Sequence, residues 1–259
     1  MVLYDQIGIS YDSTRCADPC ITQQLLEHLR FEPGAKYIDI ACGSGNYTNA
    51  IAEKGAVMYG IDESSMMIDS AKIKNGAINW VKCSVEDLPF KDCSFNGAIC
   101  TLAIHHFSSL RLAFHEVYRV LDHGRFVIFT STKEQMQNYW LNEYFPNMMK
   151  DSIKQMPSLS SIKQSLSDEG FISVSTEVFN VSKELQDLFL YSGKYRPEMY
   201  LDSNVRAGIS SFVNFSCENE VESGCNRIAI DIESRKINSI IQSYEKASGD
   251  YLFIIAQKN

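Results

Sequence analysis

The segment Lys36–Glu63, KYIDIACGSGNYTNAIAEKGAVMYGIDE, decides the fold of this chain. It opens with an apolar run over residues 37–40, which predicts a buried strand, and continues into a glycine-rich turn over 41–45. Residues 46–54 have helical spacing, and a second apolar strand then ends at Asp62. This order of strand, turn, helix, strand and acid is half of a nucleotide-binding α/β unit. In such a unit the turn presents backbone N–H groups, and the acid accepts hydrogen bonds from ribose hydroxyls.

The composition narrows the class of protein. The chain has 259 residues, of which 45% are hydrophobic and 22% charged, with a formal charge of −8. These values are typical of a globular protein. No cluster of Lys and Arg with interleaved aromatics is present, so we expect no nucleic-acid partner. No apolar run approaches the roughly 20 residues that span a bilayer, and the N-terminus lacks the features of a secretory signal. We therefore expect a cytoplasmic protein with no membrane partner.

Eight cysteines raise the question of a metal site or a disulfide framework. None of them forms a C-x-x-C pair, and no histidine lies at zinc-finger spacing. We expect no bound metal and reduced thiols, in agreement with a cytoplasmic location.

Strand and helix patterns alternate five times between Lys36 and Thr130. Such alternation predicts an α/β fold with a doubly wound, mostly parallel sheet. Ligands bind such sheets beyond the carboxyl ends of the strands. The segments expected to meet there are 39–45, Asp62, 84–87 and 101–106.

Five motifs resemble those of class I S-adenosylmethionine-dependent methyltransferases, in the branch of quinone-biosynthesis and small-molecule enzymes. They stand in the family's order over residues 36–130: YIDIACGSGNYT, GIDESSMMIDSA, VEDLPF, FNGAICTLAIHHF and EVYRVLDHGRFVIFT. Tyr11, Arg15 and the region 183–246 also resemble a subgroup of antibiotic-biosynthesis methyltransferases.

The resemblance implies a Rossmann-like methyltransferase fold with seven strands and helical lid insertions. Residues 171–181 and 251–256 are similar to the terminal antiparallel strands of the family. The expected organisation is a single domain over 1–259. Its sheet core comprises about 30–132, 158–182 and 247–259, and its helical lid insertions are about 133–157 and 183–246.

The resemblance also implies S-adenosyl-L-methionine as the methyl donor and S-adenosyl-L-homocysteine as the product. The residues expected to bind this cofactor are Tyr11, Arg15, Asp39, Ala41, Gly43, Gly45, Asp62, Met67, Ser84, Val85, Glu86 and Thr101.

Some of these positions have alternatives. Gly43 and Gly45 also fit an NAD fingerprint, but Thr48 stands at the third glycine position. In the resembled family a carboxylate at the position of Asp39 orients the turn and the methionine amino group. Arg15 is expected to pair with the methionine carboxylate, or else to be a surface residue. Ser84 stands where the family often has an aspartate that accepts from the adenine amine.

His105 and His106 follow the fourth strand, where the methyl group should face its acceptor. Histidine suits proton transfer at neutral pH, so both are candidate catalytic residues, or else they pack or cap the loop. Tyr139, Trp140 and Tyr144 are expected either to wall an acceptor pocket together with His106 or to form helix core. The loop lacks the Asn-Pro-Pro-Tyr motif with which the family marks enzymes that methylate base or glutamine amino groups.

The sequence therefore predicts a methyltransferase that acts on an O, C or N atom of a small apolar or aromatic metabolite. Two alternatives remain: a protein that binds S-adenosylmethionine without catalysis, and an NAD-dependent oxidoreductase. The sequence has no Tyr-x-x-x-Lys pair at the position where an oxidoreductase would need one for hydride transfer. The sequence leaves the oligomeric state open.

Overall fold

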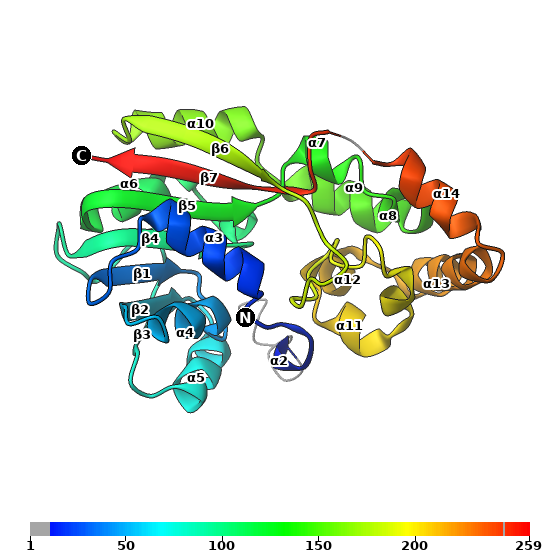
Figure 1. The fold of residues 1–259 in the computed structure, drawn as a ribbon, viewed down its shortest axis with the longest axis horizontal. Coiled ribbons are helices and arrows are strands. Elements are labelled where there is room, and N and C mark those ends of the chain that lie inside the picture. Colours follow the sequence, from blue (N-terminus) through cyan, green and yellow to red (C-terminus); the bar gives the residue numbers. More distant parts are fainter. Residues whose placement is uncertain (1–10, 246) are drawn as a thin grey trace.

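A seven-stranded sheet forms the centre of the protein in a computed structural model that describes residues 11–245 and 247–259 (Figure 1). The strand order is β3-β2-β1-β4-β5-β7-β6. The first five strands are parallel, and β7 runs antiparallel to both β5 and β6. The prediction of a doubly wound, mostly parallel sheet is thereby confirmed. The strands are β1 Lys36–Ile40, β2 Val57–Asp62, β3 Asn79–Lys82, β4 Phe95–Thr101, β5 Leu121–Thr130, β6 Ser173–Phe179 and β7 Tyr251–Lys258.

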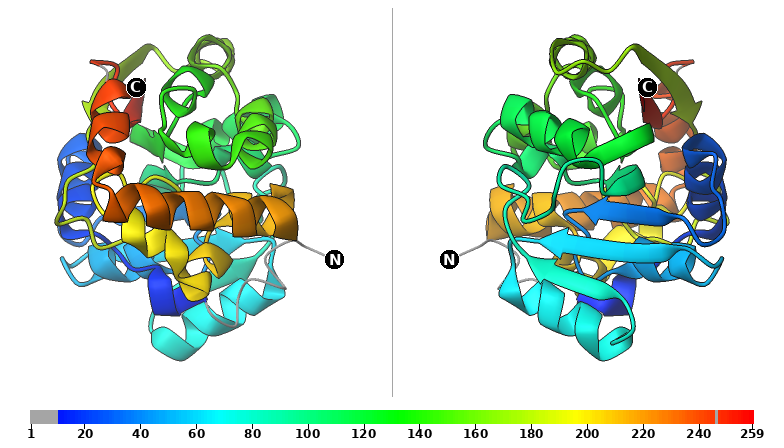
Figure 2. Two further views of the ribbon diagram at one scale, coloured as in Figure 1. Left: turned by 90° about the vertical axis from the view of Figure 1, so that its right-hand side faces the viewer. Right: turned by 90° about the vertical axis from the view of Figure 1, so that its left-hand side faces the viewer.

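Helices cover both faces of the sheet, and each face has its own apolar core (Figure 2). On one face, α3 (Pro19–Leu29), α4 (Asn46–Ala52) and α5 (Ser65–Lys74) bury their apolar residues. On the other face, α6 (Leu110–Val120) and α10 (Leu159–Asp168) do the same. A short helix, α2 (Tyr11–Thr14), precedes these elements.

Two helical segments inserted between strands pack together beyond one end of the sheet (Figure 1). The first contains α7 (Lys133–Met136), α8 (Leu141–Tyr144) and α9 (Pro146–Gln155). The second contains η2 (Pro197–Leu201), α11 (Ser203–Ala207), α12 (Ser210–Phe215), α13 (Glu218–Glu233) and α14 (Lys236–Ser243). We refer to both segments together as the lid.

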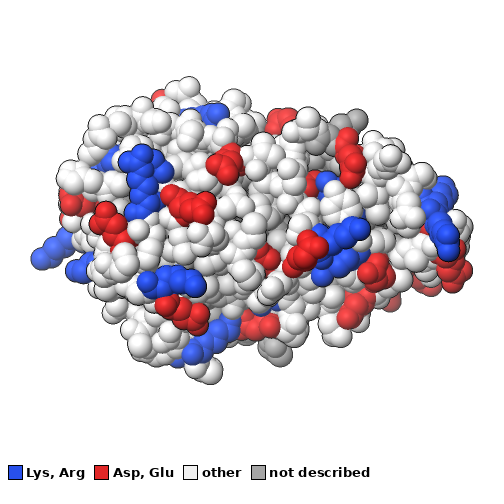
Figure 3. All heavy atoms as spheres, viewed as in Figure 1, with Lys and Arg blue, Asp and Glu red and all other residues white. Residues whose placement is uncertain are grey.

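Surface charge and helix length add two observations. On the face in Figure 3, Lys and Arg side chains are interspersed with Asp and Glu. Within the described ranges, 11–245 and 247–259, no helix is long and apolar enough to cross a membrane.

Candidate functional site

A cavity of about 450 Å³ opens where the carboxyl ends of the parallel strands face the lid. Its lining includes residues that follow β1, β2, β3 and β4, and also residues of α2 and of both lid segments. The volume is in the range of small-molecule sites, and the position is where α/β sheets bind ligands.

Gly43 lines the cavity and has no side chain that would fill part of it. Its φ is +55°, and a Cβ built on it would meet no atom within 4 Å. Because the residue lines the cavity, that Cβ would project into space available to a ligand. The Gly43 N–H donates to Asp62 Oδ2 over 2.9 Å, which ties the turn to the end of β2. The turn is thus a cradle that fits a nucleoside-containing molecule.

Gly45 has a different role from the one expected. It does not belong to the cavity lining, and a Cβ at this residue would lie 2.3 Å from the Trp80 ring. Its φ is +78°. The prediction that Gly45 contacts the cofactor is therefore corrected: the absence of a side chain makes room for Trp80.

Asp39 on β1 is bonded to Thr48 in the helix that follows the glycine-rich turn. Its carboxylate is buried and accepts from Thr48 Oγ1 over 2.6 Å, while Oδ1 has no partner among the described residues. Burial raises the pKa of Asp39 to about 7. The side chain is not part of the cavity lining, so the geometry favours positioning of the turn over direct contact with the methionine amino group.

Two non-glycine residues at strand ends adopt the left-handed region beside the cavity. Ala41 after β1 has φ +55°, and Leu102 after β4 has φ +54°. Both line the cavity, as does Thr101. Such backbone costs about 1–2 kcal/mol per residue and tends to occur at ligand sites.

Asp62 lies at the end of β2 and lines the cavity. Besides the bond from Gly43, Oδ1 accepts from the Ser64 N–H over 2.9 Å. A carboxylate at this position has the chemistry to accept hydrogen bonds from ribose hydroxyls. Met67 on α5 is buried and lines the same wall.

The loop after β3 contributes Val85 and Glu86 to the lining. Glu86 Oε1 accepts from Ser108 Oγ and from the Ser109 N–H, each over 2.7 Å, so it is fixed and not merely solvated. Ser84 lies outside the lining, because its hydroxyl accepts from the Glu86 N–H over 3.2 Å within a turn. The structure therefore gives the expected contact between Ser84 and adenine no support.

Arg15 lines the cavity but is already paired with Asp187, in the stretch before η2, a partner that the sequence did not indicate. Its Nε and Nη2 donate to the two Asp187 oxygens over 2.5 and 3.2 Å. Tyr47 Oη also donates to Asp187 over 3.1 Å, and the Arg15 guanidinium lies 5.0 Å from the centre of the Tyr11 ring. The observed partner of Arg15 is therefore Asp187, and the expected pairing with the methionine carboxylate stays a prediction.

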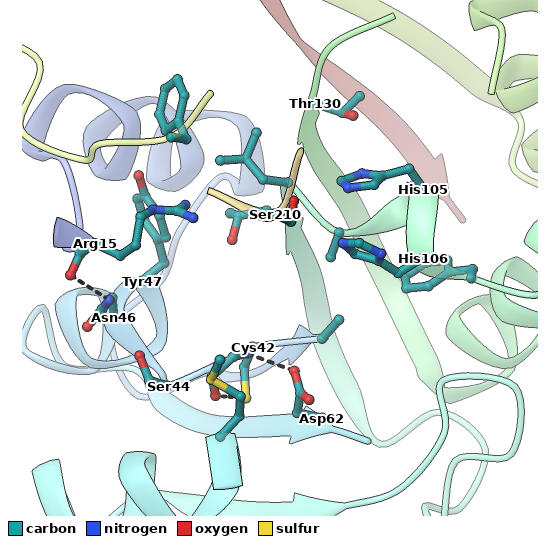
Figure 4. Close-up of a pocket in the computed structure, with 18 of the residues that line it drawn as sticks. Arg15, Cys42, Ser44, Asn46, Tyr47, Asp62, His105, His106, Thr130 and Ser210 are labelled. Carbon is teal, nitrogen blue, oxygen red and sulfur yellow. Dashed lines mark hydrogen bonds between the residues drawn. The ribbon is translucent and has the colours of Figure 1, made fainter. Parts of the chain in front are cut away.

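His105 and His106 form the wall nearest the end of β4 (Figure 4). They belong to a short helix, η1 (Ile104–His106), and their ring centres are 4.0 Å apart. Burial lowers the pKa of His106 to about 4. Burial and the neighbouring His106 lower the pKa of His105 well below its usual range. Both rings are therefore neutral at physiological pH.

Tyr139, Trp140 and Tyr144 are lid core and do not wall the cavity. Trp140 Nε1 donates to the Lys194 carbonyl over 3.0 Å, and Tyr144 Oη donates to Asp231 over 2.8 Å. Tyr139 stacks on Tyr191 and donates to the Asp250 carbonyl. Of the two alternatives for these residues, the structure favours helix core over the acceptor pocket, because their polar groups have hydrogen-bond partners away from the cavity.

The lid wall of the cavity is made by residues that carried no sequence signal. Apart from the amide of Gln155, they are apolar or hydroxyl-bearing side chains from β5, β7, both lid segments and the stretch before η2: Thr130, Ser131, Met136, Gln155, Met156, Phe189, Leu190, Ile209, Ser210, Ser211 and Tyr251.

Comparison with known proteins agrees with this geometry. Residues 38–129 match the model of a methyltransferase domain family. A crystal structure from Anabaena variabilis, provisionally assigned as a methyltransferase of an antibiotic biosynthesis pathway, is 33% identical with a TM-score of 0.85. The alignment covers 94% of this chain and 98% of that one. This chain belongs to the S-adenosylmethionine-dependent methyltransferases.

Two curated relatives show how far the similarity extends. The 2-phytyl-1,4-naphtoquinone methyltransferase of Trichormus variabilis is 27% identical over 69% of this chain and 80% of its own length. An uncharacterized methyltransferase of Synechocystis sp. is 35% identical over 38% of this chain. With that relative, as with two malonyl-[acyl-carrier protein] O-methyltransferases, the match spans about half of the relative's length.

Proposed function

We propose that this methyltransferase moves a methyl group from S-adenosylmethionine to an O, C or N atom of a small apolar or aromatic metabolite. The observation that carries the proposal is that one cavity joins two regions. One is the Gly43 and Asp62 cradle, and the other is a wall of apolar and hydroxyl side chains under the lid. The naphthoquinone relative supports an aromatic acceptor.

Within this proposal, Gly43, Asp62, Met67 and Val85 hold the nucleoside part of the cofactor. When bound, S-adenosylmethionine supplies a methyl group on a positively charged sulfur: a lone pair of the acceptor attacks the methyl carbon, and S-adenosylhomocysteine leaves. The neutral imidazoles of His105 and His106 add no positive charge near that sulfur. The lid excludes water and holds the acceptor close, which are the main contributions a protein makes to such a displacement.

We also propose a cytoplasmic location. All eight cysteines lie in the described part of the chain and are free thiols, which suits a reducing compartment.

Calorimetry with S-adenosylhomocysteine tests the donor half, and release of S-adenosylhomocysteine in the presence of naphthohydroquinone tests the acceptor half. We expect binding in the first experiment and turnover in the second. No heat of binding would overturn the proposal. Binding without turnover on any of a set of phenols, hydroquinones and amines would favour a non-catalytic binding protein.

A further inference from the structure

The direction of the His105 ring determines which of its nitrogens a ligand can reach. The side chain projects from η1 into the cavity on the side facing Ser210 (Figure 4). In an imidazole, Nδ1 adjoins the atom that joins the ring to the chain, and Nε2 lies near the far end. Nδ1 is buried and has no hydrogen-bond partner among the described residues. Nε2 is therefore the nitrogen that meets a molecule in the cavity.

The environment of Nδ1 also determines where the ring carries its proton. A buried N–H without an acceptor is rare in proteins because its full desolvation cost goes uncompensated, whereas an unpaired acceptor is tolerated more often. Within 11–245 and 247–259, no carbonyl or carboxylate is placed to receive a proton from Nδ1 of His105. The favoured tautomer therefore has its proton on Nε2, and the lone pair of the ring faces away from the cavity.

A general base needs the opposite arrangement. In a catalytic histidine the nitrogen remote from the substrate donates to an orienting group, which fixes the tautomer and stabilises the imidazolium. In the part of the chain that the structure describes, no such group holds His105 Nδ1, and the titratable side chain in contact with the ring is His106. The ring is suited to donate a hydrogen bond and not to remove a proton.

The charges of the cavity restrict the molecule that receives this bond. Among the described lining residues, Arg15 is the one that bears a full positive charge, and it is bound to Asp187. The acidic lining residues are Asp62, Glu63, Glu86 and Asp187. A phosphate or carboxylate on the acceptor would find no unpaired cation in this part of the site, so an uncharged acceptor fits better.

We propose that His105 donates a hydrogen bond from Nε2 to an oxygen of an uncharged acceptor, such as a phenol or hydroquinone, and thereby positions it. The acceptor oxygen bonds to the methyl carbon as the carbon–sulfur bond of the donor breaks, and the hydroxyl proton of the acceptor passes to water at the open side of the cavity. The identity of the acceptor rests on the proposed function, whereas the donor tautomer of His105 can be measured without any acceptor.

The first test is nitrogen-15 NMR of the full chain, with His105→Gln used to assign the signals. We expect His105 to show an unprotonated Nδ1 and a protonated Nε2, without titration between about pH 5.5 and 8. A proton on Nδ1, or a titration midpoint in that range, would overturn the donor role even if the protein proves to be an active methyltransferase.

The second test compares His105→Gln with His105→Phe, using naphthohydroquinone as the acceptor. The glutamine amide can replace the donor, whereas phenylalanine keeps only the ring shape. We expect His105→Phe to raise KM about tenfold and His105→Gln to raise it much less, since one hydrogen bond is worth about that factor. An equal loss of kcat in both variants with unchanged KM would indicate a base. Unchanged binding of S-adenosylhomocysteine shows that both variants fold.

Competition with naphthyl phosphate tests the charge argument. Naphthol is expected to displace the hydroquinone at a concentration about tenfold lower than its phosphate ester does. Equal or tighter binding of the ester would refute an uncharged acceptor.

Discussion

The Arg15 guanidinium forms a two-pronged ion pair with the Asp187 carboxylate, 172 residues away along the chain. The pair is almost dehydrated, with side-chain exposures of 12% and 1%. Leu188 N–H donates to the Thr14 carbonyl beside it over 3.1 Å. The segment before α3 is therefore fastened to the stretch between β6 and η2, at the part of the cavity wall that Arg15 and Asp187 line.

Replacing Asp187 by Asn should destabilise the protein by about 3 kcal/mol, because it leaves the Arg15 charge buried without a counter-charge. Urea unfolding would measure this change. Tyr47→Phe is the matched control, since it removes one neutral donor from the same carboxylate and should cost about 1 kcal/mol. If Asp187→Asn and the native protein have the same urea midpoint of unfolding, the ion pair does not hold these two segments together.

The two glycines of the turn should respond differently to alanine. At Gly43 the added methyl enters open space in the cavity, so Gly43→Ala should cost only about 1 kcal/mol of stability for its positive φ. The same methyl should weaken binding of S-adenosylhomocysteine, because it occupies ligand space. Calorimetry beside a melting curve would show both effects.

At Gly45 the methyl would overlap Trp80, so Gly45→Ala should lose about 2–4 kcal/mol through overpacking and backbone strain together. Its main effect should be a lowered melting temperature. If Gly43→Ala and Gly45→Ala changed the melting temperature and the binding of S-adenosylhomocysteine equally, the assignment of Gly43 to ligand binding and of Gly45 to packing would be wrong.

The residues that line the cofactor side of the cavity could be predicted from the sequence, because each lies at or just after the end of a strand that the sequence shows as an apolar run. Gly43, Asp62 and Val85 all reach the cavity in this way. The sequence of the turn did not show that Gly45 faces Trp80, because contact with a ligand and packing against a ring both call for a glycine.

The lid was harder to predict because its contacts are made between segments far apart in sequence. The helical insertion expected over about 133–157 consists of three separate helices, α7, α8 and α9, and Pro146 begins the last of them since it lacks the N–H needed to continue a preceding helix. Tyr144 looked like a pocket residue by composition, yet its partner is Asp231, 87 positions away. No local pattern carries that information.

Tyr144→Phe should therefore lower stability by about 1 kcal/mol through the lost bond to Asp231 and leave cofactor binding unchanged. Leu190→Ala, at a half-buried side chain that lines the cavity, is the contrasting variant. It should raise KM for naphthohydroquinone by about tenfold through lost apolar contact. A Tyr144→Phe enzyme with an altered KM would return that residue to the acceptor pocket.

Asp39 should make stability fall as the pH rises. Burial raises its pKa in the native protein to about 7, whereas the unfolded chain has a value near 4. Between these values the native state holds a proton that the unfolded state has released, so the free energy of unfolding decreases with pH.

Asp39→Asn cannot ionise and should remove this contribution. Relative to the native protein, the variant should gain about 3 kcal/mol between pH 5 and pH 8, measured by urea unfolding at both values. Thr48→Val deletes the hydrogen bond that lowers the pKa of Asp39, so the fall should continue to higher pH. A constant difference between the native protein and Asp39→Asn across this range would show that Asp39 is ionised throughout.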